Sequence, residues 1–374
     1  AQQIPEQFDL AIDALLGIGA QRPPEGVIAK WLNALQTTDA HVLCVDIPTG
    51  LNADTGEWLG TTKAHASNTQ RHTLSLLTLK PGLFTADGRD ASGQVWFNNL
   101  RVETTQACTA WLQQHIATTS SRPHNTHKGS FGDVSVIGGA SGMSGAAALA
   151  AVAALHGGAG RVFVGVMDAS ARHAISAAHP PLMVRAPEDL NLHTSTTVCG
   201  CGGSDDIHAL LPNVLSSSQQ LVLDADALNA VARDTSLQSL LIKRSARHKP
   251  TVLTPHPLEA ARLLNCTAKD VQQNRLLAAQ QLADKFQCVV ILKGSGSIIA
   301  SPQHSPVINS SGNALLATAG TGDVLAGLTG AYIARHEDAF EASCQAVFAH
   351  GHVADIWPEA GPALDAALLA ASVH

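Results

Sequence analysis

The chain has 374 residues, of which 45% are hydrophobic and 14% are charged. Its length exceeds one average domain of ~100–150 residues, so two domains are expected, and its composition is that of a globular protein rather than a disordered one. Acidic residues outnumber basic ones by 30 to 23 and no long Lys/Arg run occurs, which argues against nucleic acid or an anionic membrane as a partner and favours a small molecule.

The first third of the chain alternates apolar runs with a helix-like stretch. Residues 10–16, 42–45 and 74–79 have the composition of buried parallel strands, and residues 27–35 that of a crossover helix. We therefore expect an α/β domain over residues 1–115. Residues 116–126 are rich in Ser, Thr, Pro and Asn and lose hydrophobic periodicity, which predicts a linker.

Hydrophobic periodicity returns in a second predicted domain, residues 127–374. It opens with a βαβ unit made of strand 134–137, a glycine-rich turn, the small-residue helix 146–155 and strand 162–166. Further strands are expected at 221–223, 252–253 and 289–292, and each is followed by polar or turn residues. Because ligands bind beyond the carboxyl ends of parallel strands in open α/β sheets, we expect these three tails to converge on one site.

The seven cysteines form no CxxC framework, which predicts free thiols in a reducing compartment. Only Cys199 and Cys201 lie close in sequence, and a turn beside glycines explains this CxC more simply than a metal site does. No apolar run approaches the ~20 residues that span a bilayer, and the first residues lack the pattern of a signal peptide. We expect a cytoplasmic protein with no membrane partner.

The loop that ends in Asp323 is the most informative segment of the second domain. Gly320 and Gly322 can aim backbone N–H groups at a phosphate where a helix begins, and Thr321 lies between them. Asp323 in the first helical turn can accept a proton from a substrate hydroxyl, and it can equally be a helix-capping residue.

A second loop follows the strand 289–292. Its residues are Lys293, Gly294, Ser295, Gly296 and Ser297. The lysine and the glycine backbone can approach a nucleotide phosphate, although a bare hairpin turn explains the segment about as well. Neither loop has the Walker pattern, and GGASGMSG lacks the GxGxxG spacing of a dinucleotide-binding dehydrogenase.

Five blocks taken together resemble the NAD(P)H-hydrate dehydratase family in order and spacing. They are HKGSFGDVSVIGGASGMSGAAALAAVAALHGGAGRV, LDADALN, TPHPLEAARLL, VVILKGSGSIIASP and NALLATAGTGDVLAGL. The resemblance covers about residues 127–374. It implies a ribokinase-like α/β fold, the use of ADP or ATP with Mg²⁺, and removal of water from the S epimer of hydrated NADH (NADHX) or hydrated NADPH (NADPHX). A homo-oligomer is also expected.

The resemblance assigns roles to residues that match the family motifs. Asp323 matches the catalytic aspartate, Gly320 and Gly322 match its anion hole, and the segment from Lys293 to Ser297 matches the nucleotide-phosphate segment. The residues that match the hydrate pocket are Ala146, Gly202, His256 and Asp323.

Each of these assignments has a structural alternative. His256 between prolines can be a rigid turn, and Ala146 can be helix packing. Asp224 and Asp226 either orient a metal or the nucleotide, or cap the next helix. Where the family usually has GPGLG, this chain has Gly-Cys-Gly-Gly-Ser at 200–204, so the turn that holds Gly202 departs from the pattern.

The N-terminal third resembles the later half of the NAD(P)H-hydrate epimerase domain, a partial Rossmann-like α/β unit. The matching segments are DALLGIGAQRPPEG, CVDIPTGLNADTGE and LKPGLFTADGRDASGQV. The match implies a K⁺ site at Asp13 and Thr49 and an Asp46 that faces the hydrate; a helix cap is the simpler role for Asp46. The implied substrate phosphate loop, which a strand-end turn would also explain, comprises Gly17, Ile18, Gly19, Ala20, Gln21, Arg22 and Pro23. Because no Asn- and Gly-rich loop precedes Ala1, an incomplete epimerase of doubtful activity is expected.

Two further hypotheses compete with hydrate repair. A ribokinase-like kinase of a vitamin precursor would also use a GTGD loop for phosphoryl transfer, although the epimerase-like neighbour argues against it. A regulatory nucleotide-binding module without turnover is disfavoured because Asp323 stands beside intact glycines.

Overall fold

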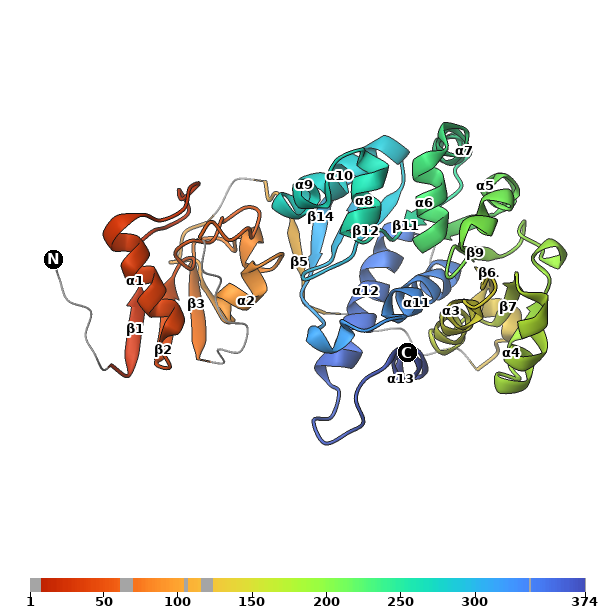
Figure 1. Cartoon of the computed structure of the whole chain (residues 1–374), viewed down its shortest axis with the longest axis horizontal. Helices are drawn as coiled ribbons and strands as arrows, with labels where there is room; N and C mark the ends of the chain where they lie inside the picture. The colour runs from red at the N-terminus through yellow and green to blue at the C-terminus, as the bar shows by residue number, and fades with distance from the viewer. Residues whose placement is uncertain (1–7, 61–69, 104–106, 116–123, 336–337, 374) are drawn as a thin grey trace. The chain divides into compact units, whose positions relative to one another are not determined.

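The computed structural model describes residues 8–60, 70–103, 107–115, 124–335 and 338–373 (Figure 1). The chain divides into two compact units: Ala1–Ala110 with the short segments 269–276 and 294–296, and Trp111–Ala268 with Leu277–Lys293 and Ser297–His374. The division after residue 110 lies close to the predicted domain end at 115, and most of the predicted linker, 116–126, lies outside the described residues. The domain bounds stay a prediction. In the described parts of the chain, every helix is too short or too polar to cross a bilayer.

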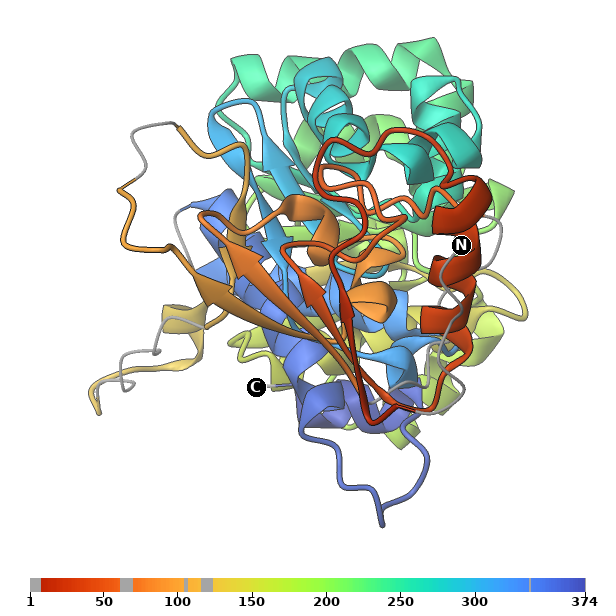
Figure 2. The ribbon, with the colours of Figure 1, turned by 90° about the vertical axis from the view of Figure 1, so that its left-hand side faces the viewer.

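The first unit is built on a four-stranded parallel sheet whose strands lie in the order β1-β2-β3-β4, drawn red to orange in Figure 2. Its elements are β1 (Leu10–Asp13), α1 (Gly26–Thr37), β2 (His41–Val45), β3 (Arg71–Leu76), the 3₁₀ turn η1 (Pro81–Leu83), α2 (Gly88–Ser92) and β4 (Gln94–Asn98). The three predicted strands and the predicted helix are present. The third strand ends at Leu76 rather than at residue 79, because Leu77 adopts a left-handed φ of 64° that no strand residue can hold.

The second unit contains a ten-stranded sheet with the order β5-β14-β13-β12-β11-β10-β9-β6-β7-β8. Neighbouring strands are parallel except where β13 pairs antiparallel with both β12 and β14. The strands are β5 (Trp111–Gln113), β6 (Asp133–Gly138), β7 (Arg161–Val166), β8 (Met183–Arg185), β9 (Thr196–Cys199), β10 (Gln220–Leu223), β11 (Thr251–Leu253), β12 (Val289–Leu292), β13 (Ile298–Ser301) and β14 (His304–Asn309).

Helices connect most of these strands and pack on the sheet (Figure 1). They are α3 (Ser144–His156), α4 (Arg172–Ala178), α5 (Leu211–Ser217), α6 (Ala225–Arg233), α7 (Thr235–Ala246), α8 (Pro257–Leu264), α9 (Ala268–Gln273), α10 (Arg275–Phe286), α11 (Thr321–Arg335), α12 (Ala339–Asp355) and α13 (Ala366–Ser372). The 3₁₀ turns are η2 (Lys128–Phe131), η3 (Ala169–Ala171), η4 (Pro187–Asp189), η5 (Asp205–Ala209) and η6 (Ala314–Leu316). Helices α3, α11, α12 and α13 contact one another and enclose the main core.

The small residues of α3 let α11 approach it backbone to backbone. A Cβ added at Gly327 of α11 would lie 1.9 Å from the carbonyl oxygen of Ala150 in α3, and one added at Gly330 would lie 2.4 Å from Val198 of β9. Only glycine fits at contacts this short. The start of α11, which carries Asp323, is therefore held against both α3 and the sheet.

Candidate active site

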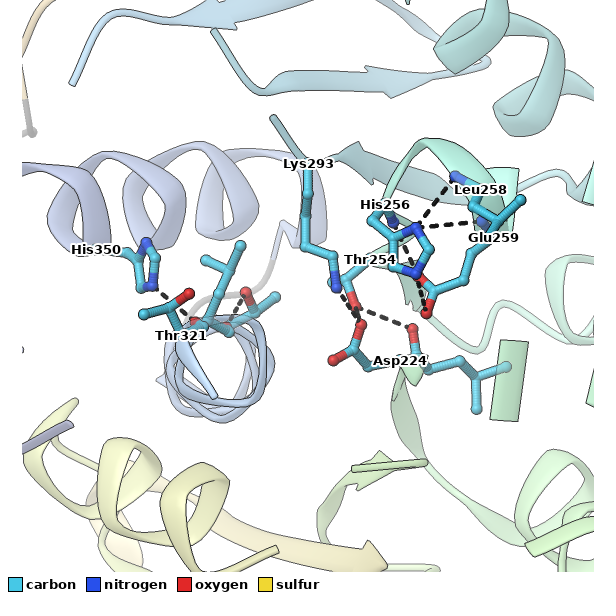
Figure 3. A network of polar contacts seen from close by, with 11 residues as sticks. Asp224, Thr254, His256, Leu258, Glu259, Lys293, Thr321 and His350 are labelled. Carbon is cyan, nitrogen blue, oxygen red and sulfur yellow. Dashed lines mark hydrogen bonds and ion pairs between the residues drawn. The ribbon is translucent and has the colours of Figure 1, made fainter. Parts of the chain in front are cut away.

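Three side chains that follow neighbouring strands meet at the carboxyl edge of the large sheet. The Lys293 ammonium lies 2.6 Å from Oδ1 of Asp224, and the Thr254 hydroxyl donates to the same oxygen at 2.7 Å (Figure 3). Asp224 follows β10, Thr254 follows β11 and Lys293 follows β12. The expected convergence of the three tails is confirmed.

The two aspartates of the LDADALN block do different things. Asp224 is the N-cap residue of α6, but its carboxylate makes no capping hydrogen bond and is used by Lys293 and Thr254 instead. Asp226, in the first turn of α6, accepts a hydrogen bond from the backbone N–H of Ser204 at 2.9 Å. Asp226 therefore fixes the turn that follows β9.

Asp323 lies in the first turn of α11, beside the glycine loop. The helix begins at Thr321, so Asp323 is not its N-cap residue, and Gly320 before it has a φ of 89° that favours glycine. The Lys293 ammonium lies close to the loop, 3.4 Å from where a Cβ on Gly322 would be. The Asp323 carboxylate thus lies near the N-terminus of α11, Gly320, Gly322 and the Lys293 ammonium. The helix N-terminus and the ammonium both favour negative charge, so the arrangement suits a phosphoryl group.

The electrostatic environment of Asp323 suits a base that works near neutral pH. Burial, and then the charge of Asp224, raise the pKa of Asp323 to about 6, while Lys293 acts in the opposite direction. Burial alone would lower the pKa of Lys293, but the nearby Asp224 and Glu259 outweigh it and raise that pKa, so the ammonium stays charged. A carboxylate with a pKa near 6 holds a transferred proton better than an ordinary one does.

The segment from Lys293 to Ser297 connects the antiparallel strands β12 and β13, so its geometry is that of a hairpin connection. Gly294 and Gly296 both have positive φ values, 141° and 61°, which this connection requires. Lys293 of this segment reaches the network around Asp224. The nucleotide-binding role of Gly294, Ser295, Gly296 and Ser297 stays a prediction.

His256 is the N-cap residue of α8 and forms a capping box with Glu259. Its Nδ1 accepts the backbone N–H of Leu258 at 3.1 Å, and its Nε2 lies 3.1 Å from Oε1 of Glu259 (Figure 3). Both ring nitrogens are thus engaged within the protein, as the turn alternative expects. The imidazole is still half-exposed, and its predicted role in the hydrate pocket stays a prediction.

Gly202 and Ala146, two residues predicted for the hydrate pocket, lie in contact. Gly202 has a φ of 61°, and a Cβ there would lie 2.6 Å from the carbonyl oxygen of Met143 and 2.9 Å from the Cβ of Ala146. The Gly200–Ser204 turn therefore keeps its close approach to α3, although its sequence departs from the family pattern.

Sequence reasoning missed Cys201, Thr254 and His350. The Cys201 sulfur, an Asp224 oxygen and an Asp323 oxygen all lie within 4.8 Å of one another, whereas the sequence favoured a simple turn over a metal site for the CxC. His350 is buried in α12, and burial lowers its pKa to about 4, so its neutral Nε2–H donates to the carbonyl oxygen of Thr321 at 2.9 Å (Figure 3). Only tertiary structure brings these residues to the site.

In the first unit, the predicted phosphate loop lines a cleft of about 660 Å³. The lining residues are Leu16, Gly17, Ile18, Gly19, Ala20, Gln21, Arg22, Pro23, Pro24, Glu25 and Ile28. The seven predicted residues therefore share one concave surface, next to the start of α1.

Asp13 and Thr49 are brought together at the end of β1. The Thr49 hydroxyl and backbone N–H donate to the two carboxylate oxygens of Asp13 at 2.6 and 2.8 Å. Asp13 is only 2% exposed, and among the described residues no basic side chain forms an ion pair with it. A buried carboxylate with hydroxyl and carbonyl oxygens around it fits a bound monovalent cation such as K⁺.

Asp46 follows β2 and holds a left-handed φ of 70°. Its carboxylate forms an ion pair with Lys80 and accepts the Leu76 backbone N–H at 2.9 Å, so it caps no helix. A strained, charge-paired aspartate at a strand end is typical of a functional position.

Comparison with known proteins gives the family. The family described as NAD(P)H-hydrate dehydratase matches residues 134–373, and the YjeF-related protein N-terminus matches residues 1–82. A bifunctional NAD(P)H-hydrate repair enzyme from Escherichia coli is 34% identical in an alignment of length 368 that covers 94% of this chain and 68% of that protein. An ADP-dependent (S)-NAD(P)H-hydrate dehydratase from Neisseria meningitidis is 38% identical in an alignment of length 258 that covers 67% of this chain and 86% of that protein.

Solved structures agree with the sequence matches. The ADP/ATP-dependent NAD(P)H-hydrate dehydratase of Bacillus subtilis has a TM-score of 0.59 and 28% identity, and covers 67% of this chain and 92% of its own. A ribokinase-like superfamily protein of Enterococcus faecalis has a TM-score of 0.61 at 23% identity over 73% of this chain and 96% of its own, which supports the fold. The predicted ribokinase-like α/β fold is confirmed, and the chain belongs to the NAD(P)H-hydrate dehydratase family, with a YjeF-related N-terminal part like that of the bifunctional NAD(P)H-hydrate repair enzymes.

Proposed function

We propose that the second unit removes water from the S epimer of hydrated NADH or NADPH, with ADP or ATP as the phosphoryl donor. The observation that carries this proposal is the position of Asp323. It is a half-buried carboxylate at the start of a helix, between a glycine loop and the Lys293–Asp224 pair, with its pKa raised to about 6.

The first step is a phosphoryl transfer. Asp323 accepts the proton of the ring hydroxyl while the hydroxyl oxygen attacks the terminal phosphorus of the nucleotide, whose bridging oxygen leaves with the electron pair. Backbone N–H groups at Gly320 and Gly322 and the charge of Lys293 face the transferred group.

The second step is an elimination. Hydroxide is a poor leaving group, but the phosphate ester leaves readily with the electron pair of the C–O bond. The departing phosphate or water accepts the proton of the adjacent ring carbon, and the electrons of that C–H bond form the double bond of the dihydropyridine. Phosphate, the shortened nucleotide and NADH or NADPH are the products.

Mg²⁺, when bound with the nucleotide, supplies positive charge to the phosphates. We assign it no ligand in this chain.

Hydrate repair is favoured over the vitamin-precursor kinase. The matching family and the relatives at 34% and 38% identity are hydrate dehydratases or repair enzymes, and the neighbouring unit matches a YjeF-related N-terminus. Phosphoryl transfer alone would explain the Asp323 site but not this neighbour.

The deciding experiment adds ADP or ATP to purified S hydrate and the chain, and follows the return of NADH absorbance. Restored NADH in proportion to enzyme and nucleotide is expected. Nucleotide consumption with a stable phosphorylated product and no NADH would instead identify a kinase.

For the first unit we propose a K⁺ site and a hydrate-binding loop of the epimerase kind, with almost no interconversion of the R and S hydrates by this chain. The support for binding is the buried Asp13–Thr49 pair, the cleft lined by the Gly17–Pro23 loop and the Asp46–Lys80 ion pair. Separated R hydrate, incubated with the chain and K⁺ but without nucleotide and followed by chromatography, should convert to S no faster than without the chain. Conversion in proportion to the amount of the chain would refute this expectation.

A further inference from the structure

The turn after β9 aims Cys201 into the active site and leaves it little freedom. Gly200 has a φ of 122°, and a Cβ there would lie 1.9 Å from the carbonyl oxygen of Asp224. The Gly139 N–H donates to the Cys201 carbonyl at 3.0 Å, and the Ala140 N–H donates to the Gly202 carbonyl at 2.7 Å. The backbone on both sides of Cys201 is therefore fixed.

The Cys201 side chain is fully buried and its sulfur faces two carboxylates. The sulfur and one oxygen each of Asp224 and Asp323 lie within 4.8 Å of one another. Lys293 already occupies Asp224 as its ion-pair partner and Thr254 donates to the same carboxylate. Asp323 has no such basic partner among the described residues, so the thiol is its polar neighbour.

The thiol stays protonated at neutral pH. Burial, and then the charges of Asp323 and Asp224, raise the pKa of Cys201 well above its ordinary value. An S–H group is a weak donor, and a buried carboxylate oxygen is the acceptor that it meets here. Cys201 is thus a neutral donor rather than a nucleophile.

We propose that Cys201 is a positioning residue for Asp323, whose thiol donates to one carboxylate oxygen and leaves the other for the substrate hydroxyl. The inference rests on the proposed function, in which Asp323 is the base. It gives a role to a side chain that no motif of the sequence had assigned.

The groups around Asp323 determine in which direction its pKa would move if the Cys201 thiol were removed. Burial, Asp224 and Asp226 raise the pKa of Asp323, whereas the nearby Cys201 thiol and the charge of Lys293 lower it. Lys293 is itself balanced by Asp224 and Glu259, and Glu259 is paired with His256. Without the thiol, one of the two groups that favour the ionised base is lost.

The test compares the pH dependence of kcat/KM in the wild type, Cys201→Ala and Cys201→Ser, each first checked for a wild-type circular dichroism spectrum and melting transition. We expect Cys201→Ala to move the acid limb to higher pH by about half a unit, because a donor to a carboxylate is lost. Cys201→Ser keeps a donor and should return the limb to the wild-type position or below. An unmoved limb in Cys201→Ala overturns the proposal.

A second measurement does not depend on turnover. The S–H stretching band of Cys201, isolated as the infrared difference between wild type and Cys201→Ala, is expected at lower frequency than that of a free thiol. It should return toward the free value in Asp323→Asn, whose amide is a weaker acceptor. If Cys201→Ala failed to fold, Cys201→Ser would serve as the reference for the same difference spectrum. A free-thiol frequency in the wild type would overturn the inference.

The two proposals fail differently. If Asp323→Asn kept near-normal dehydration, the base assignment would be wrong and the pH test would have no meaning. If Asp323→Asn were inactive, while Cys201→Ala left the acid limb unmoved and the S–H band had the same free-thiol frequency in the wild type and in Asp323→Asn, only the Cys201 role would be lost.

Discussion

The Lys293 ammonium lies 2.6 Å from Asp224, whose side chain is 2% exposed, and 3.4 Å from the position that a Cβ on Gly322 would take. One cation therefore neutralises a buried carboxylate and adds positive charge at the start of α11. The nucleotide-binding role of Lys293 stays a prediction. An experiment on Lys293 must therefore distinguish loss of nucleotide binding from loss of the ion pair with Asp224.

Replacing Lys293 by Met should destabilise the protein by about 3–5 kcal/mol, because it leaves a buried carboxylate unpaired. Denaturant unfolding of the second unit measures this. Lys243→Met, which removes an exposed lysine of α7, is the control and should change stability by less than about 0.5 kcal/mol. Adding Asp224→Asn to Lys293→Met should recover part of the loss; a larger loss would show that the pair is not the cause.

Asp323→Asn should abolish dehydration and leave nucleotide affinity largely unchanged, since the amide keeps the shape of the side chain but accepts no proton. Turnover is followed by the return of NADH absorbance, and ADP or ATP binding by calorimetry. Lost nucleotide binding would place Asp323 in the nucleotide site instead.

The same substitution should stabilise the fold at neutral pH. The folded pKa of about 6 lies above the ordinary value of 3.8, so the folded state binds this proton more tightly than the unfolded state does. Stability therefore falls as pH rises from about 4 to 6. Asp323→Asn removes this cost, and its unfolding free energy at neutral pH should exceed that of the wild type by about 1–3 kcal/mol. If the wild type had the same unfolding free energy at pH 4 and at pH 6, the pKa of Asp323 would not be raised in the folded state.

The catalytic rate should fall at low pH because Asp323 becomes protonated there. Asp323 must be ionised to accept a proton, so kcat/KM should fall about tenfold per pH unit below about 6. Stopped assays across that range with a fixed nucleotide concentration give the profile. A limb near pH 4 would contradict the environment described for this carboxylate.

The contact between α3 and α11 can be tested with two glycines. Gly327→Ala should destabilise the second unit by about 1–3 kcal/mol or more, because its Cβ would meet the Ala150 carbonyl at 1.9 Å. The matched control is Gly145→Ala at the start of α3, where no atom lies within 4 Å of the added Cβ and helix propensity favours alanine. Thermal melts of both variants suffice, and equal melting temperatures would contradict the close approach.

Thr49→Val tests the cation site of the first unit, since it removes the hydroxyl that contacts Asp13 and Leu16. In the wild type, K⁺ should raise the melting temperature of this unit relative to a large organic cation. The variant should lose that difference. A K⁺ effect that survives in Thr49→Val would move the cation elsewhere.

Much of the large sheet could be predicted because parallel strands buried on both faces are continuous apolar runs. β6, β7, β10, β11 and β12 are fully or mostly buried, and the polar residues at their ends marked the active site edge. The antiparallel pair β13 and β14 was missed. The KGSGS turn had been recognised as a possible hairpin, but no second strand was proposed after it.

The site was predicted where one motif holds both the residue and its chemistry, as at Asp323. It was missed where the role depends on a neighbour far away in the sequence. Cys201 gains meaning only from Asp323, and His350 only from the carbonyl of Thr321. Neither pairing leaves a local pattern, because each joins different elements packed on the same sheet.

The close approach of Gly327 to Ala150 joins α11 and α3 into a single rigid body. Asp323, the proposed base, is carried by α11, and Ala146, which is predicted to line the hydrate pocket, is carried by α3, so the spacing between these two residues is set by the packing of the two helices. A bulkier residue at Ala150, far from Asp323 in the sequence, would push α11 away from α3 and displace Asp323 with it.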